Sequence, residues 1–226
     1  MDLKDIERIV GQYVGWILGA ERIPWFCCFG TLLGFIRDNG AVKGDNDIDL
    51  GMFYEHMDEE RIVKGMKKYN YTLHHKIVNN YEKPNKPYYL SFTSEQHPPL
   101  CLFAWVKHGE FRYHTYDTKH EKPQGGVPSE YVFKGVPANL FDDILSHWPA
   151  DKDKKQLTRH EFKIPRKYGT LLDLWYPDWK TPRKGESHTP YVVRMKNCKD
   201  WKNAELIEKC HKQSQEEYDS YLDTLV

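Results

Sequence analysis

Asp47 and Asp49 are the side chains whose type and spacing predict chemistry most directly. They flank Ile48, and successive side chains of a strand point to opposite faces, so both carboxylates share one face while Ile48 points into the core. Two carboxylates side by side repel each other, and a divalent cation between them removes that repulsion. Mg²⁺, or Mn²⁺ in its place, is the hard cation that carboxylates and substrate phosphates share. The pair therefore predicts a metal site whose ligands, Asp47 and Asp49, are also catalytic.

The segment before these carboxylates predicts a strand, a turn and a short helix. Residues 24–29 are apolar and end at Gly30, which indicates a buried strand. The hydroxyl of Thr31 is placed to accept a free backbone N–H in the first turn of a helix over residues 32–38, and Asn39 then stops that helix. This strand–turn–helix unit is what must position the carboxylates.

An Asp-x-Asp pair alone is common in loops and at strand edges, and it usually binds nothing. Here a glycine turn and an arginine precede the pair at a spacing that lets both segments face one cleft. Together they resemble the signature of the LicD/fukutin family, which belongs to the nucleotidyltransferase superfamily typified by DNA polymerase beta. The resemblance is carried by Gly30-Thr31-Leu32-Leu33-Gly34-x-x-Arg37 and Asp45-x-Asp47-Ile48-Asp49, with Gly44 in place of a family Trp and Asn46 in place of an Asp.

A second block, residues 162–182, resembles the C-terminal pattern of the same family, although Pro177 stands where a Gly is usual. The resemblance implies an α+β fold: a small mixed β-sheet flanked by helices, with a nucleotidyltransferase-like core and a C-terminal helical extension. The chain would then be a single domain, 1–226, with its core at about residues 20–182 and an extension over 183–226 that ends in a helix.

The resemblance also implies a third carboxylate on a later strand, and the expected position holds a different residue. Family members often carry a run like Ile-Asp-Ile-Phe there. In this chain the run reads Leu100-Cys101-Leu102-Phe103, so Cys101 stands in the place of the acid. A thiol therefore occupies the position from which the resemblance implies a ligand for a second metal and a base that activates the acceptor.

The residues after Cys101 predict a hairpin. Two strand-like stretches flank His108-Gly109, which suits a two-residue turn with Lys107 opposite Glu110. In that register His114 is a diagonal neighbour of Cys101, at about 7–8 Å. His114 is then a candidate catalytic base near neutral pH, and the alternative interpretation is an exposed strand residue.

Other residues of the first block are candidates for holding a phosphate. Gly30 and Thr31, with the start of the helix behind them, can meet a phosphate with backbone N–H groups. Arg37 can neutralise phosphate charge, or it can pair with Asp38 or Asp45 instead. The predicted donor-binding residues are Gly30, Thr31, Arg37 and, in the loop before the carboxylates, Lys43.

The remaining elements follow from periodicity and turn residues. Helices are predicted over residues 3–18, 58–69, 166–175 and 203–225, and further strands over residues 71–78, 88–93 and 162–165. Residues 119–129 are rich in Gly and Pro and predict a loop over the cleft.

Composition narrows the classes of partner. The 226 residues contain 33 Lys plus Arg and 33 Asp plus Glu, so no net charge recruits nucleic acid or an anionic membrane. No signal peptide is recognised and no apolar run approaches about 20 residues, so no membrane span is expected, although peripheral association with a membrane is compatible with the sequence. The five cysteines are irregularly spaced, which argues against paired disulfides and favours a cytoplasmic location.

The resemblance implies a transferase. LicD-like enzymes move a phosphorylated alcohol such as phosphocholine from a CDP-linked donor to a hydroxyl of a glycan or glycolipid, and they release CMP. Two alternatives stay open: transfer of a nucleotide from an NTP to a small molecule or protein, and a nucleotide-binding descendant that has lost catalysis, suggested by Cys101.

Overall fold

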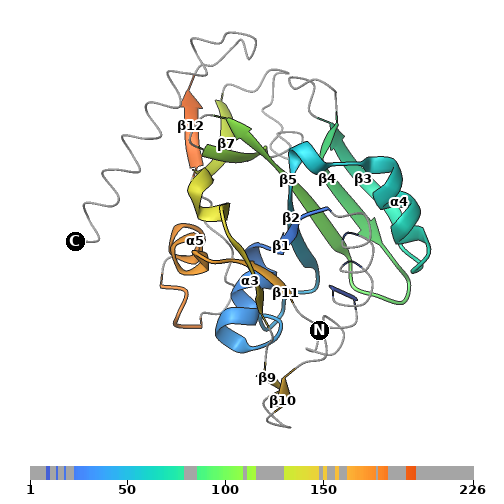
Figure 1. The fold of residues 1–226 in the computed structure, drawn as a ribbon, viewed down its shortest axis with the longest axis horizontal. Helices are drawn as coiled ribbons and strands as arrows, with labels where there is room; N and C mark the ends of the chain where they lie inside the picture. Colours follow the sequence, from blue (N-terminus) through green and yellow to red (C-terminus); the bar gives the residue numbers. More distant parts are fainter. Residues whose placement is uncertain are drawn as a thin grey trace.

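The computed structural model describes residues 9, 10, 14, 18, 23–78, 86–108, 111–115, 130–147, 150–151, 156–157, 162–176, 178–182 and 192–196. Within them, the centre of the fold is an eight-stranded mixed sheet (Figure 1). Its main path is β1 (Trp25–Cys27), β2 (Ile48–Phe53), β5 (Leu100–His108), β6 (Phe111–Thr115), β7 (Glu130–Pro137) and β12 (Val192–Lys196), and β4 (Pro87–Thr93) joins β3 (Thr72–Val78) to β5. Two separate strand pairs are β8 (Ile144–His147) with β11 (Phe162–Pro165), and β9 (Ala150–Asp151) with β10 (Gln156–Leu157).

β2 and β5 form the parallel pair at the middle of this sheet. Their register sets Asp49 beside Cys101. On the other edge of β5, β4 runs antiparallel and sets Ser91 beside Cys101. β1 runs antiparallel to β2, with Cys27 opposite Leu50. The predicted small mixed sheet is confirmed, as are the predicted strands over residues 71–78, 88–93 and 162–165.

A short helical segment connects β1 to β2. α3 (Phe29–Leu33) begins after Cys28, whose backbone is extended, and continues into the π-helical turn η2 (Gly34–Asp38). Asn39 follows in the left-handed conformation, with φ 55°, which Asn tolerates better than most residues. The predicted stop at Asn39 is confirmed. The strand is shorter than predicted, and the helix begins at Phe29 rather than at Leu32.

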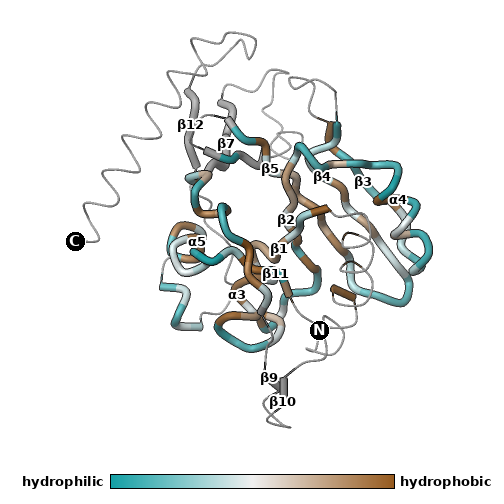
Figure 2. Tube along the Cα trace, viewed as in Figure 1, coloured by the Kyte–Doolittle hydropathy of each residue, from teal (hydrophilic) through white to brown (hydrophobic). Residues whose placement is uncertain are grey.

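Apolar side chains on alternate positions of β2 form part of the core. Ile48, Leu50 and Met52 are fully buried, as the two-residue period of a strand requires. Figure 2 shows hydrophobic residues along β1 and β2, whereas α4 (Glu59–Lys67) is largely hydrophilic and buries one stripe. The side chain of Asp58 accepts a hydrogen bond from the backbone N–H of Arg61, so the predicted helix over residues 58–69 is confirmed with its N-cap.

Of the predicted N-terminal helix, residues 9, 10, 14 and 18 are described, and all four are helical. Ile9, Val10, Val14 and Leu18 are buried in the same core. The spacing of these four positions agrees with the predicted apolar stripe.

Aromatic side chains link the two sequence blocks. Phe29 of α3 lies 4.7 Å from Trp175 of α5 (Tyr168–Trp175) and 5.0 Å from Phe103, measured between ring centroids. Trp105 lies 5.3 Å from Phe141 of the 3-10 helix η4 (Ala138–Phe141). α5 is therefore packed beside α3 (Figure 1). The predicted helix over residues 166–175 is confirmed, with its start two residues later.

The register of the β5–β6 hairpin differs from the prediction by two residues. Lys107 pairs with Arg112, and His108 pairs with Phe111. Arg112 explains the shift, because its guanidinium donates two hydrogen bonds to Glu55 of η3 (Tyr54–His56) at 2.7 and 3.2 Å and lies 4.1 Å above the Phe53 ring. A shift of two keeps every side chain on its predicted face, but it moves each one along the strand.

Several predictions lie outside the described residues: the loop over residues 119–129, the helix over residues 203–225 and the C-terminal extension as a whole. The division into one domain with an extension stays a prediction. Among the described helices, none has the length and apolar character that a membrane span needs.

Candidate metal centre

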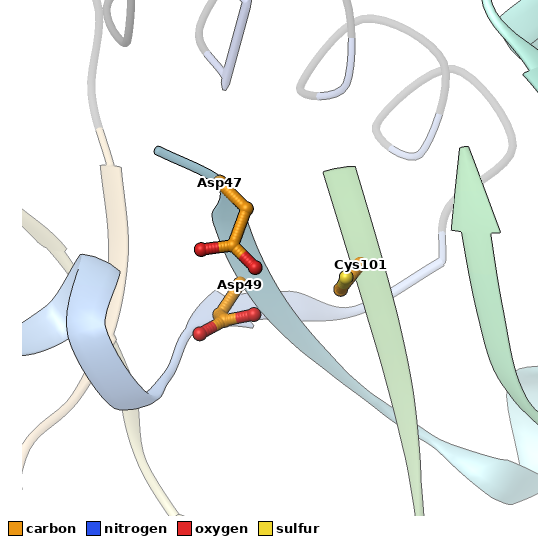
Figure 3. A group of neighbouring side chains, drawn as sticks. All are labelled: Asp47, Asp49 and Cys101. Carbon is orange, nitrogen blue, oxygen red and sulfur yellow. The ribbon is translucent and has the colours of Figure 1, made fainter. Parts of the chain in front are cut away.

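Three potential metal ligands meet where β2 and β5 begin. The donor atoms of Asp47, Asp49 and Cys101 all lie within 4.8 Å of one another. Figure 3 shows the two carboxylates projecting from the same side of β2 and Cys101 on the neighbouring strand. Asp49 lies in β2, while Asp47 immediately precedes it, so the strand begins one residue later than predicted. The two predicted ligands are brought together, with both side chains partly exposed.

Asp49 is held by hydrogen bonds to the start of α3. Its backbone N–H donates to Oγ1 of Thr31 at 2.8 Å, and its carbonyl accepts from the N–H of Cys28 at 3.2 Å. The backbone N–H of Gly30 also donates to its carboxylate. Thr31 therefore does not cap the helix as predicted, because its hydroxyl is used by β2 instead. Phosphate binding by Gly30 and Thr31 stays a prediction.

A third acid, Asp45, packs against this unit. A Cβ atom added at Gly30 would overlap Oδ2 of Asp45, so a larger residue there would displace this carboxylate from its present position against the helix. Burial, together with a hydrogen bond to Asp47 and the charge of Asp47, raises the pKa of Asp45 to about 7. From sequence, Asp45 is expected as part of the family signature and as an alternative partner for Arg37, but not among the metal ligands. Its position two residues before Asp47 is the available signal for a larger acidic group.

The surroundings of Asp49 and Cys101 disfavour negative charge in the absence of a cation. Desolvation, followed by the charges of Asp47 and Asp45, raises the pKa of Asp49 well above its usual range. Desolvation and the charge of Asp49 raise the pKa of the Cys101 thiol to about 12. A divalent cation would reverse these effects, because it favours the ionised form of each ligand.

Hydroxyl groups surround the sulfur of Cys101. The Tyr89 hydroxyl lies 3.1 Å from Sγ, and Ser91 also hydrogen-bonds to this sulfur. The ring of Tyr89 in turn packs on Phe103, at 5.1 Å between ring centroids. The site is thus a row of polar groups across β4, β5 and β2, bordered by aromatic side chains.

Arg37 lies at the joint between the two sequence blocks. Its guanidinium donates to both oxygens of Asp38, at 2.9 and 2.7 Å, and to the carbonyl of Trp179 at 3.2 Å. Of the two acids considered as partners, Asp38 is the one that pairs with it. Lys43 is exposed in the loop before Asp47. A phosphate contact by Arg37 or Lys43 stays a prediction.

His114 is not brought to the three ligands. Because Tyr113 pairs with Val106, His114 lies level with Trp105. That is four residues along β5 from Cys101, or roughly 13 Å at the rise of a strand. The predicted diagonal contact between His114 and Cys101 is wrong, since it depended on the hairpin register. The role of His114 as a base stays a prediction that the backbone geometry does not support.

Known proteins resemble this chain in sequence and in structure. The domain family described as LicD/FKTN/FKRP, nucleotidyltransferase domain, matches residues 22–151, which include β1, α3, β2 and β5. Among curated proteins no match was found. Two solved structures are similar at 11% identity: the lincosamide antibiotic adenylyltransferase LnuA with bound lincomycin (71% of this chain, 81% of that chain, TM-score 0.39) and the antibiotic-resistance factor ANT(2'')-Ia (98% and 95%, TM-score 0.41).

Proposed function

Since the chain belongs to the LicD/FKTN/FKRP family of nucleotidyltransferase domains, we propose that it is a metal-dependent transferase that moves a phosphorylated alcohol, of the phosphocholine type, from a CDP-linked donor to a hydroxyl of a glycan or glycolipid. Family membership supports the transferase class. The CDP donor and the glycan acceptor are the specific part of the proposal.

The observation that carries the proposal is the pair of carboxylates at the start of β2. Asp47 and Asp49 offer oxygen donors from one side of one strand, which fits a divalent cation such as Mg²⁺ or Mn²⁺. When bound, such a cation supplies charge neutralisation at the donor diphosphate and at the departing CMP. The third position is a sulfur, and this donor does not fit Mg²⁺.

The protein's own contribution is positioning. Thr31 and Cys28 hydrogen-bond to the backbone of Asp49, and the N–H of Gly30 donates to its carboxylate, so this ligand is positioned before substrate arrives. Phosphoryl transfer asks for little covalent chemistry from the protein, because alignment of the attacking hydroxyl with the departing phosphate oxygen supplies much of the rate. We assign Gly30, Thr31, Arg37 and Lys43 to the donor phosphates as part of this proposal.

Radiolabelled donors test the proposal. The full chain is incubated with choline-labelled CDP-choline, a divalent cation and a mixture of glycolipids and free sugars, and in parallel with α-labelled NTPs. The expected result is CMP release with choline label on an acceptor, lost in Asp47→Asn and kept in Glu60→Gln, an exposed acid of α4. Label from an NTP on an acceptor would instead support nucleotide transfer.

The alternative of a catalytically inactive descendant is motivated by the sulfur of Cys101 in the place of an acid. Calorimetry with CDP-choline and a divalent cation distinguishes it. Binding without turnover, in the wild type and under every cation tested, would favour this alternative over the transferase.

A further inference from the structure

We propose that Cys101 is the residue that determines which cation this site selects, and that the site prefers Zn²⁺ over Mg²⁺. The inference rests on the metal site of the proposed function and concerns the identity of its ion. The donor set contains two carboxylates and one sulfur, on neighbouring strands. In catalytic zinc sites, the metal is bound by three protein ligands and its fourth coordination position is open to water or substrate.

The backbone already places the sulfur with the carboxylates. Asp49 and Cys101 are paired in the parallel register of β2 and β5, so their side chains share a face. The three donor atoms span at most 4.8 Å. At a tetrahedral angle, a metal–oxygen bond of about 2.1 Å and a metal–sulfur bond of about 2.3 Å place the two donors about 3.6 Å apart, so side-chain shifts of roughly 1 Å are enough to close the set around one ion.

The contacts of the Cys101 sulfur are those of an oriented ligand. Its side chain is 7% exposed, and the hydroxyl of Tyr89 lies 3.1 Å from Sγ with Ser91 as a second hydrogen-bonding neighbour. Groups that hydrogen-bond to a metal ligand fix its direction and support its charge. Leu100 and Leu102, which flank Cys101, point to the opposite face and are fully buried.

The strand arrangement excludes a disulfide between Cys101 and Cys28. Cys28 donates its N–H to the carbonyl of Asp49, and Asp49 in turn pairs with Cys101, so Asp49 lies between the two cysteines. Two strand spacings are about 9.5 Å, which exceeds the roughly 6.8 Å between Cα atoms that a disulfide tolerates. Cys101 is a free thiol in this structure.

The preference follows from ligand chemistry. Mg²⁺ takes oxygen ligands in a near-octahedral arrangement and gains little from a sulfur, whereas Zn²⁺ binds cysteine sulfur, imidazole and carboxylate in tetrahedral sites. Restoring an acid with Cys101→Asp gives three oxygen donors and should move the preference toward Mg²⁺. Cys101→Ser keeps the size of the side chain and removes the sulfur.

Cobalt is the spectroscopic probe, because Co²⁺ enters zinc sites and gives a charge-transfer absorption when a sulfur is bound. The full chain, freed of metal by a chelator, is titrated with Co²⁺ and then with Zn²⁺. The expected result is a sulfur-to-cobalt band that Zn²⁺ removes, that is absent in Cys101→Ser, and that persists in the matched double variant Cys198→Ser/Cys210→Ser. Tyr89→Phe should keep the band and weaken Zn²⁺ binding by about 10–100-fold.

Zinc X-ray absorption on the wild type tests the inference without any substitution. One sulfur at about 2.3 Å from zinc is expected. Zinc bound only through oxygen or nitrogen, or Cys101→Ser binding Zn²⁺ as tightly as the wild type, would overturn the inference. Sulfur-bound metal in a chain that transfers nothing from CDP-choline would overturn the proposed function alone. Full transfer with Mg²⁺ and no metal–sulfur bond would overturn the inference about Cys101 and leave the proposed function intact.

Discussion

Acidic side chains lie at both ends of β2, and their surroundings shift their pKa values in opposite directions. At the start of the strand, desolvation and neighbouring carboxylates raise the pKa values of Asp45 and Asp49. Just after its end, burial alone would raise the pKa of Glu55, but hydrogen bonds from Arg112 and from its own backbone, with the charge of Arg112, lower it. The carboxylate of Glu55 is thus neutralised by a neighbouring arginine, whereas the carboxylates at the start of β2 have a charge that a divalent cation would offset.

The same contrast appears in the role of arginine. Arg112 joins β6 to Glu55 and to the Phe53 ring, and this contact sets the register of a hairpin. At the other end of β2, Asp45 and Asp49 both lie near the charge of Asp47, and no arginine is among the groups that shift their pKa values. Like charges held together cost stability that protonation or a bound cation recovers, and such groups are common in functional sites. Substitutions at the two ends of β2 test this difference.

The largest effect is expected on catalysis. Asp47→Asn or Asp49→Asn should reduce release of CMP from CDP-choline by about 10²–10³-fold, the loss typical of removing one electrostatic contact at a reacting group. The unfolding temperature without metal should stay equal or rise, because one repelling charge is gone. Glu60→Gln is the control. A metal-free Asp49→Asn protein that unfolds at lower temperature than the wild type would show that repulsion between the carboxylates is not the main effect of Asp49 on stability.

Cation binding should stabilise the folded protein. At a free cation concentration of 100 times Kd, the free energy of unfolding should rise by about 2.7 kcal/mol. Denaturant unfolding with and without chelator measures this change. The rise should vanish in Asp49→Asn and persist in Glu55→Gln, which lies at the other end of β2. Equal stabilisation of both variants would place the cation elsewhere.

Gly30→Ala should cost about 1 kcal/mol in unfolding free energy, because its Cβ overlaps the end of the Asp45 side chain and displaces that carboxylate from the acidic group. It should also weaken cation binding, measured by calorimetry. Gly169→Ala in α5 is the matched control: its Cβ would meet no atom within 4 Å, so helix propensity makes that change neutral or stabilising by up to about 1 kcal/mol. If Gly30→Ala and Gly169→Ala were equally stable, the result would contradict the close contact between Gly30 and the Asp45 carboxylate.

The smallest effect concerns pH. The pKa of Glu55 is lower in the folded chain than the value of 4.5 for the free group, so the pair with Arg112 stabilises the fold above about pH 4.5 and this stabilisation is lost as pH falls through the folded pKa. Glu55 is 47% exposed, so solvent screening limits the contribution to about 0.2–1 kcal/mol. Glu55→Gln should lower the unfolding free energy by that amount at pH 7 and by less at pH 3. If the loss of unfolding free energy in Glu55→Gln were larger at pH 3 than at pH 7, the result would contradict this prediction.

Most of the local structure was predictable from sequence. The apolar stripe of residues 58–69, the stop at Asn39 and the strands after Tyr71 and Pro87 depend on neighbours within one or two turns of chain, and the structure confirms them. The pairing of Asp47 with Asp49 on one face follows from the two-residue period of a strand. The family resemblance seen in residues 30–49 is confirmed by the match over residues 22–151.

The predictions that failed required a choice between partners far apart in sequence. The turn at His108-Gly109 suits a hairpin by itself, yet the contact of Arg112 with Glu55 moves the pairing and takes His114 away from Cys101. Thr31 has a hydroxyl that can cap a helix, but Asp49 of β2 uses it. Local chemistry offers each side chain several partners of similar energy, and packing selects among them.

Residue types and their spacing were enough to identify the two carboxylates, the sulfur in the place of the third acid and the short elements that carry them. Only the packing of distant segments brings Arg37 to the carbonyl of Trp179, sets Asp45 against Gly30, and places Tyr89 and Ser91 beside Cys101. The physical reason is range. Periodicity and turn chemistry act over a few residues, whereas register, burial and the resulting pKa shifts exist only once distant strands have paired.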